Sequence, residues 1–467
     1  MQECVEDKIE LQQQRAGYRS TNGPDADIKR PEFHANNELK EGNHDGEAKV
    51  PQWYHNDLMA AVGWLDVTNA LDFPANVWNQ VPIPLFARLL MGFGGAIAVL
   101  WVGFAIWDLR RSSQNIKMLR AERAWLWSNR RRYVRCSVEQ PNQLNLVDAW
   151  LNINSRELGW ELIDRSLMDI LLGFSGILVG TGTFMAIRGD VPVIFHASNL
   201  LSGYVGNSFI AINALASLLW CISMWRRASW ELGVIARAQT TSELRSRMRR
   251  RAFADQLYAF LNSVTALIGS AGSLLSATKW AGYIIVAPCA AGSIFCNLFW
   301  RHKLGYSRLG FQSWAYRQEF DIQERLEELN ALRLLLLEKK ERSVNITKLL
   351  MGAEGRPQSV LVRFMREHGM WEQYSKVLGK KHGVDPVVNG CQHVTGTCEC
   401  PYQVVLHDQR VVMDAARECL ERDGRHRFRD EERFLLELYA CYLGEQEHSN
   451  RWSRPLPDKC EARFVNS

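Results

Sequence analysis

Hydrophobic positions gather into long unbroken runs in the middle of the chain. The run from Leu85 to Trp107 holds about 23 residues and one charge, Arg88, near its start. A bilayer core of about 30 Å requires about 20 helical residues at 1.5 Å each. No polar stripe interrupts the run, and membrane helices tolerate its glycines. The pattern therefore predicts a first transmembrane helix over residues 85–107.

Four more runs pass the same test, and they predict an all-α, multi-pass transmembrane bundle of about five spans. These runs cover residues 167–187, 203–225, 257–278 and 280–300. A further apolar stretch, residues 191–202, is too short to cross a bilayer. It predicts an interfacial or re-entrant segment, or a sixth span if its helix extends differently.

Lys and Arg concentrate in two of the loops between the predicted spans. Residues 108–136 and 226–255 are strongly basic, whereas the opposite loops are short and nearly uncharged. The positive-inside rule places the basic loops and the C-terminal segment in the cytosol. The N-terminus is then expected outside or in a lumen, although its polar tail must cross without a cleavable signal peptide. The organelle stays open.

The segments that flank the predicted bundle are polar. Residues 1–50 are rich in charged residues, Asn and Gly, which predicts a disordered tail, as does the composition of residues 445–467. Residues 51–84 show a short amphipathic pattern. It is typical of a helix on the membrane surface, or of a cap packed on the bundle. Helical periodicity in residues 301–444 predicts a cytosolic helical domain.

Three stretches carry a resemblance to a family. They run from YHNDLMAAVGWLDV to PIPLFARLLMG, and through SRELGWELIDRSLMDILLGF and SNLLSGYVGN. In these stretches the chain resembles multi-pass fungal integral membrane proteins without assigned activity. The resemblance covers about half of the chain and implies a membrane location, but it implies no chemistry and no functional residues.

The sharpest candidate for chemistry is a loop over residues 390–401, GCQHVTGTCECP. Its four soft ligands could hold Zn²⁺ tetrahedrally; they are Cys391, His393, Cys398 and Cys400. Zinc knuckles usually leave two residues between their cysteines, and this loop leaves one. We therefore favour a loop with free thiols over a metal site, and we expect no other cofactor. The 11 cysteines are scattered, which favours reduced thiols over a disulfide scaffold.

Small and polar residues recur inside the predicted spans. Gly176 and Gly180 form a GxxxG pattern, which favours close helix packing within a bundle over a specific dimer motif. The only acidic residue in a predicted span is Asp169, near its start. The amide side chains are expected either to join helices by hydrogen bonds, which we favour, or to line a path for a ligand. They are Asn207, Asn213, Asn262 and Asn297.

Arginine clusters flank the predicted spans on the basic side. Each cationic residue near an anionic leaflet contributes about 1 kcal/mol of attraction, so these clusters predict contact with acidic lipids in addition to setting orientation. Nucleic-acid binding is not expected, because the charge lies beside the membrane. The cluster residues are Arg130, Arg131, Arg132, Arg135, Arg245, Arg247, Arg249, Arg250 and Arg251.

No familiar enzyme motif stands out. The chain lacks a phosphate-binding loop that ends in Gly-Lys-Ser/Thr, a His-Glu-x-x-His and a Gly-x-Ser-x-Gly. With no charge at the centre of any predicted span, we expect a non-enzymatic membrane anchor or scaffold that binds protein partners through its C-terminal helices. The alternative is a channel or facilitator with an amide- and glycine-lined path, and the third is a membrane-embedded enzyme.

Overall fold

The computed structural model of the chain consists almost entirely of helices. It describes residues 53–57, 64, 67, 69–78, 82–135, 141–310, 321–337, 361, 364–382 and 409–452. Within these ranges, five helices are long and apolar enough to cross a membrane, which confirms the predicted all-α, multi-pass class. The chain forms two compact units. The larger unit holds the described parts of residues 53–310, 322–326 and 429–452.

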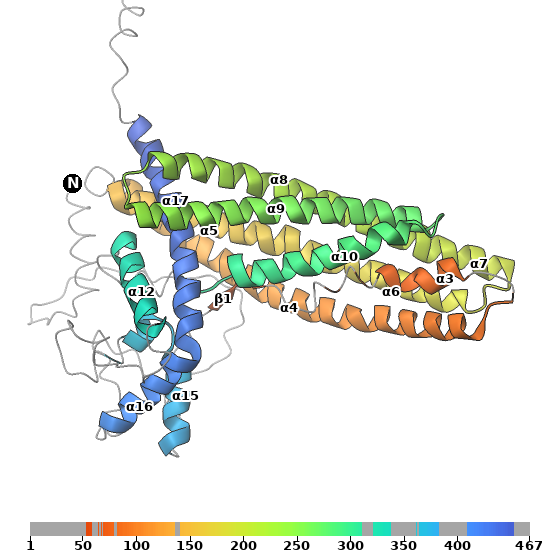
Figure 1. The fold of residues 1–467 in the computed structure, drawn as a ribbon. Coiled ribbons are helices and arrows are strands. Elements are labelled where there is room, and N and C mark those ends of the chain that lie inside the picture. The colour runs from red at the N-terminus through yellow and green to blue at the C-terminus, as the bar shows by residue number, and fades with distance from the viewer. Residues whose placement is uncertain are drawn as a thin grey trace, which may run out of the picture. The chain divides into compact units, whose positions relative to one another are not determined.

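The first two long helices extend well beyond the apolar runs that predict them. Helix α4 covers Leu85–Arg135, so it continues for about eight turns after the apolar run ends at Trp107. Its partner is one continuous helix made of α5 (Pro141–Gly159), the π-helical segment η3 (Trp160–Leu167) and α6 (Met168–Ala186). The two run side by side in the bundle (Figure 1).

The third long helix begins earlier than predicted. It combines α7 (Pro192–Asn199), the π-helical segment η4 (Leu200–Gly206) and α8 (Asn207–Arg237). Residues 191–202 are thus neither a re-entrant segment nor a separate span, because they form the first turns of this helix. Pro192 occupies the first turn, where a proline costs no hydrogen bond, and no further proline follows before α8.

The last two long helices form a tight antiparallel hairpin. They are α9 (Ser242–Ser276) and α10 (Gly282–Phe299), and the π-helical segment η5 (Trp300–Leu304) continues α10. A Cβ atom on Gly282 would lie only 2.4 Å from the backbone nitrogen of Ser276. The short connection therefore depends on glycine at this position.

Large apolar side chains cover the outside of the bundle. Leu100 and Leu219 are each 70% exposed, and Phe93 is 67% exposed. A large apolar surface promotes aggregation of a protein in water, whereas lipid tails solvate it. This surface is the one that a multi-pass membrane protein presents to the bilayer.

Small residues let α4 and α6 approach closely. A Cβ atom on Gly180 would lie 3.0 Å from Val99 and 3.1 Å from the carbonyl oxygen of Gly95, and one on Gly176 would lie 3.4 Å from Val102. The GxxxG pattern is thus used inside the bundle, between two helices of the same chain.

The segment before α4 reaches both ends of the bundle. We call the end that holds Leu85 the outer end and the opposite end the inner end. Strand β1 (Trp53–His55) pairs antiparallel with β2 (Ser307–Leu309), directly after η5, so it lies at the inner end. Strand β1 also contacts α4, because Nδ2 of Asn115 donates to the carbonyl oxygen of His55 at 3.0 Å.

Residues 69–77 lie in the outer half of the bundle. The 3-10 turn η2 (Asn69–Asp72) and helix α3 (Phe73–Val77) pack among the long helices, and the carbonyl oxygen of Leu71 faces Gly94. Gly94 and Asn115 are 21 residues apart on α4, which corresponds to about 31 Å. The described residues 69–77 thus pack on the bundle, and whether residues 51–84 also contact the membrane surface stays a prediction.

Part of the C-terminal sequence belongs to the larger unit, in contrast to the predicted boundary at residue 301. Helix α17 (Arg425–Trp452) joins it from Arg429 onward, and α12 (Ile322–Leu337) joins it up to Leu326. Arg325 links these two parts, because its guanidinium donates to Glu431 at 3.0 Å.

The smaller unit has buried residues of its own. Its described helices include α15 (Trp371–His382) and α16 (Gln409–Cys419), with the π-helical turn η7 (Leu420–Gly424). Phe364, His368 and Phe428 pack their rings together, with centroids 4.4 to 6.2 Å apart. The predicted tails, residues 1–50 and 445–467, fall outside the described residues except for 445–452, which continue α17.

Candidate solute-binding cavity

A cavity of about 80 Å³ lies inside the bundle among η3–α6, α8, α9 and α10. Each helix contributes one stripe of residues at helical spacing. On α9 the stripe contains Asn262, Thr265, Ser270 and Ser273, and on α8 it contains Asn213 and Ser217. Several polar side chains of α8 and α9 are therefore on the faces that meet at this cavity.

Among the described residues that line the cavity, Asp164 is the only charged one. It belongs to η3 and shares a helix face with Met168 and Leu172, which also line the cavity. Its side chain is 5% exposed, and its hydrogen bond from Ser217 Oγ is long, at 3.5 Å. A π-helical segment inside an α-helix is often associated with a functional site, since it turns side chains away from regular spacing.

The cavity follows the bundle axis over most of the apolar belt. Its lining on α9 runs from Tyr258 to Ser273, which corresponds to about 22 Å of helix. Asp164 lies near its inner limit, because the neighbouring Arg165 pairs with Asp108, the first residue after the apolar run of α4. Pro288 lies inside α10 beside the cavity and leaves a backbone carbonyl without its helical donor.

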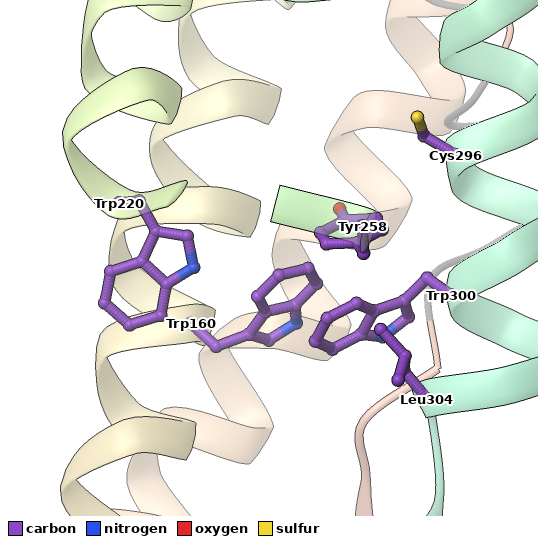
Figure 2. Close-up of a cluster of buried hydrophobic side chains, with 6 residues drawn as sticks. All are labelled: Trp160, Trp220, Tyr258, Cys296, Trp300 and Leu304. Atoms are coloured by element: carbon purple, nitrogen blue, oxygen red, sulfur yellow. The ribbon is translucent and has the colours of Figure 1, made fainter. Parts of the chain in front are cut away.

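An aromatic cluster borders the inner end of the cavity, which it shares through Tyr258 and Cys296 (Figure 2). Trp160 and Trp300 stack face to face, with ring centroids 3.6 Å apart and planes 4° apart. Tyr258 lines the cavity and packs against Trp300 at 4.9 Å. Trp160 and Trp300 are the first residues of η3 and η5, so both rings of the stack sit where the helix changes from α to π geometry.

A second polar contact lies beyond the outer end of the cavity. Tyr283, less than one turn before the lining residue Val286, donates its hydroxyl hydrogen to Asp72 Oδ1 at 2.7 Å. Asn76 Nδ2 donates to Asp72 Oδ2 at 3.0 Å. Burial raises the pKa of Asp72 to about 6, against the opposing effect of the hydrogen bonds from Tyr283 and Asn76. Residues 69–77 thus cover the start of α10.

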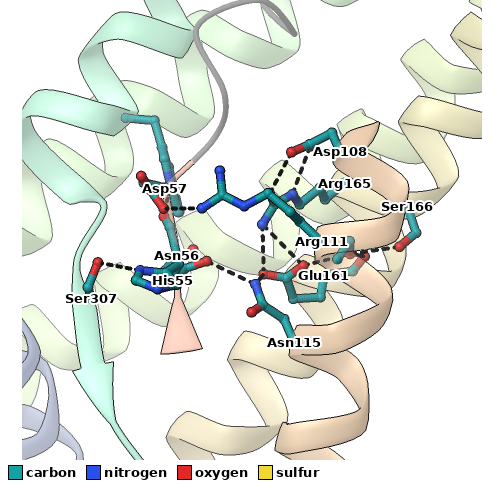
Figure 3. A network of polar contacts seen from close by, with 12 residues as sticks. His55, Asn56, Asp57, Asp108, Arg111, Asn115, Glu161, Arg165, Ser166 and Ser307 are labelled. Carbon is teal, nitrogen blue, oxygen red and sulfur yellow. Dashed lines mark hydrogen bonds and ion pairs between the residues drawn. The ribbon is translucent and has the colours of Figure 1, made fainter. Parts of the chain in front are cut away.

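A network of buried charges joins α4 to η3 at the inner end (Figure 3). Arg165 donates to both oxygens of Asp108, at 2.6 and 2.8 Å, and its Nη1 lies 3.2 Å from Glu161. Glu161 also accepts hydrogen bonds from Ser112 at 2.6 Å and from Asn115 at 2.8 Å. Glu161 and Arg165 each have several partners, which makes the network a structural element rather than an open site.

A second network holds β2 to α4 and α5. Arg308 pairs with Glu122 at 2.7 Å and with Glu157 at 2.5 Å, and its guanidinium lies 5.3 Å from the ring centres of Tyr54 and Trp150. Burial alone would lower the pKa of Arg308, but the two glutamates raise it well above the ordinary value. The arginine is therefore permanently charged.

A third network attaches α17 to the bundle. Glu437 accepts from Arg251 at 2.8 Å and pairs with Arg156 at 3.2 Å. Arg156 also pairs with Glu231 of α8 at 2.8 Å. Burial alone would raise the pKa of Glu437, but the nearby arginines outweigh it and lower the pKa.

The residues singled out from the sequence are distributed over several environments. Asn213, Asn262 and Asn297 line the cavity, whereas Asn207 joins helices by donating to the carbonyl oxygens of Gly203 and Ser273, each at 2.8 Å. Asp169 is buried beside Asp108 and Arg165 and does not line the cavity.

The basic residues also separate into two groups. Arg247 and Arg251 pair with Glu432 and Glu437 of α17, and Arg130 pairs with Asp148, so these three arginines face protein. Arg245 donates to the carbonyl oxygens of Ala238 and Thr240. Arg131, Arg249 and Arg250 are exposed. Arg132 and Arg135 end α4, and their side chains lie outside the described residues.

The candidate zinc ligands Cys391, His393, Cys398 and Cys400 lie outside the described residues. In the part of the chain that the structure describes, no group of three or more His, Cys, Asp or Glu side chains is placed to hold a metal ion.

Sequence reasoning missed Asp164, because the apolar run that predicts the second span begins only at Leu167. A signal was present in the spacing. Asp164, Met168 and Leu172 repeat every four residues, and the polar residues Asn262, Thr265, Ser270 and Ser273 fall on one face of α9. Asp164 was not distinguished from the neighbouring charged residues Glu161 and Arg165, which lie on another face of η3.

Comparisons of the chain with protein-family models, with curated proteins and with solved structures find no match. Function is therefore argued from the geometry of the bundle.

Proposed function

We propose that this multi-pass membrane protein provides a path for small polar solutes. The observation that carries the proposal is the cavity, where polar residues of α8, α9 and α10 meet the carboxyl group of Asp164 inside a bundle whose outside is apolar. Polar side chains are expensive in a membrane unless they serve binding or packing. In this bundle, polar side chains line a cavity in addition to joining helices. This arrangement favours a facilitator over a protein that serves only as an anchor.

The two ends of the cavity support a path that opens and closes. The Trp160–Trp300 stack bounds the inner end, and the Asp72–Tyr283 contact lies beyond the outer end. In this proposal the two contacts are gates, and their simultaneous closure would give the occluded state of a facilitator. Displacement of either barrier would connect the cavity with one side of the membrane.

The test is solute flux into liposomes that contain the purified full-length protein. We expect uptake of acetamide and urea, measured by stopped-flow light scattering, to exceed uptake by empty liposomes. Ala290→Phe adds a ring inside the cavity and should reduce this flux at least tenfold. Ala291→Phe is the matched control, because Ala291 is exposed on the outer surface of the same helix and does not line the cavity.

Two results would refute the proposal. One is flux no greater than that of empty liposomes from protein that elutes as a monodisperse peak. The other is equal flux through the Ala290→Phe and Ala291→Phe variants, since solute would then bypass the cavity.

Partner binding through the C-terminal helices is the second candidate function. It is favoured by the smaller unit, whose helices α15 and α16 carry buried residues such as Tyr374 and Val412. Capture on the full-length protein and on a variant that lacks residues 327–428 would test it. A protein retained only by the full-length chain is the supporting result, provided that both chains are monodisperse.

The orientation and surroundings of the bundle remain proposals as well. The exposed Arg131, Arg249 and Arg250 support a cytosolic inner end in contact with anionic lipids. The resemblance to fungal membrane proteins stays a prediction.

A further inference from the structure

We infer that the cavity binds a small organic cation, a primary ammonium group held against Asp164. This inference rests on the proposed function, because it names the substrate class of the same cavity. The first argument is charge balance. Two other buried carboxylates of the larger unit have arginine partners: Asp108 has Arg165, and Glu157 has Arg308.

Asp164 differs from these carboxylates. It is 5% exposed, and no Lys, Arg or His side chain in the described ranges forms an ion pair with it. The hydroxyl of Ser217 is its hydrogen-bonding neighbour, at a distance of 3.5 Å. A buried carboxylate without a cationic partner costs several kcal/mol as an anion, so it either keeps a proton or receives a cation from solution.

The side chains around Asp164 suit an ammonium group. Asn262 directs its Nδ2 to Cys221 Sγ at 3.6 Å, which leaves its carbonyl oxygen as an acceptor. Asn213 supplies a second amide, and Ser217 supplies a hydroxyl oxygen. An ammonium nitrogen donates up to three hydrogen bonds, and this set offers a carboxylate and several neutral oxygens as acceptors.

The aromatic floor favours an organic cation over a metal ion. Tyr258 lines the cavity beside the Trp160–Trp300 stack, and aromatic faces attract organic cations within about 6 Å of the ring centre. A divalent metal ion would require more than one carboxylate for tight binding. An anion would be repelled by the carboxylate of Asp164, the one charged group among the described lining residues.

Binding of methylammonium to the purified full-length protein tests the inference. We expect methylammonium chloride to raise the melting temperature and to change tryptophan fluorescence in a saturable way. Acetamide, a neutral molecule of similar size, and sodium chloride at equal ionic strength should give at most one tenth of the apparent affinity.

Variants locate the site. Asp164→Asn keeps the shape of the side chain and should weaken methylammonium binding at least tenfold. Asp169→Asn is the matched control, since it removes a buried carboxylate from the same helix outside the cavity. Asn262→Asp places a second carboxylate on the cavity wall and should strengthen binding severalfold. This gain keeps the inference testable if Asp164→Asn fails to fold.

The inference is wrong if the Asp164→Asn and wild-type proteins bind methylammonium equally, or if sodium chloride produces the same response. It is also wrong if acetamide competes as well as methylammonium. Failure here is distinguishable from failure of the proposed function: acetamide flux that Ala290→Phe blocks would retain the path and remove only its preference for cations.

Discussion

Arg165 donates hydrogen bonds to both carboxylate oxygens of Asp108, at 2.6 and 2.8 Å, and neither side chain is exposed. Removing the arginine leaves the carboxylates of Asp108 and Glu161 buried beside Asp169 without their cation. We expect Arg165→Met to lower the free energy of unfolding by about 3–5 kcal/mol. The melting temperature of the purified protein measures this loss.

A control for this variant lies on the surface of the same unit. Arg237 is 58% exposed and pairs with Glu447 at 2.9 Å. Arg237→Met should cost at most about 1 kcal/mol, because water screens an exposed pair. Equal effects of the two substitutions would mean that the Arg165 network contributes nothing beyond an ordinary surface pair.

Glu437 should make the attachment of α17 sensitive to acid. Its pKa lies below the ordinary value of 4.5, because Arg156 and Arg251 outweigh the effect of burial. The lowered pKa contributes stability that is present above pH 4.5 and is lost as the pH falls through the folded-state pKa. Glu437→Gln should therefore melt below the wild type at pH 7, and the difference should shrink at acid pH. A constant difference from pH 7 to pH 3 would exclude this role.

Asp72 should have the opposite pH dependence. Its pKa is raised from 3.8 to about 6, so the folded protein holds the proton more tightly than the unfolded chain. The free energy of unfolding should then fall by about 3 kcal/mol as the pH rises from about 4 to about 6. Asp72→Asn should remove this slope from a series of melting curves. Retention of the full slope in the variant would assign it to another group.

Gly180 should be intolerant of larger side chains, because a Cβ atom there already lies 3.0 Å from Val99. We expect Gly180→Leu to cost at least about 1–3 kcal/mol through overpacking between α4 and α6. Gly103→Leu is the control: Gly103 has no atom within 4 Å of its Cβ position. Because leucine improves helix propensity equally at both sites, the difference in melting temperature reports packing alone.

Both ends of the bundle sequence should be accessible from the same side of the membrane. Strand β1 lies beside β2 at the inner end, and Leu85 lies at the opposite end. A protease site inserted before Trp53 and one inserted after Trp452 should be cut from the same face of sealed vesicles. Cleavage from opposite faces would support the predicted outside location of the N-terminus and contradict the strand pairing.

The apolar runs predicted the five long helices because the thickness of a bilayer sets a length that few soluble helices match. They could not predict how far α4 continues beyond Trp107, since that half is held by buried partners such as Glu122 and Arg308 rather than by lipid. Glu437 likewise resembles any carboxylate on a polar helix until Arg156 and Arg251 are placed beside it.

The candidate site was visible only in part. Asn213, Asn262 and Asn297 were singled out as amides in predicted spans, and all three line the cavity. Asp164 was not singled out, because it stands before the apolar run among other charged residues. The partner of β1 could not be predicted locally, since 252 residues separate His55 from Ser307.

The pairing of β1 with β2 has a consequence for biosynthesis. Strand β1 leaves the ribosome before any long helix exists, and its partner is made only after the fifth. Strand β1 therefore has no β2 to pair with until all five long helices have been synthesised. Closure of this small sheet is therefore a late assembly step, and chains that stall before Ser307 lack the strand that completes it.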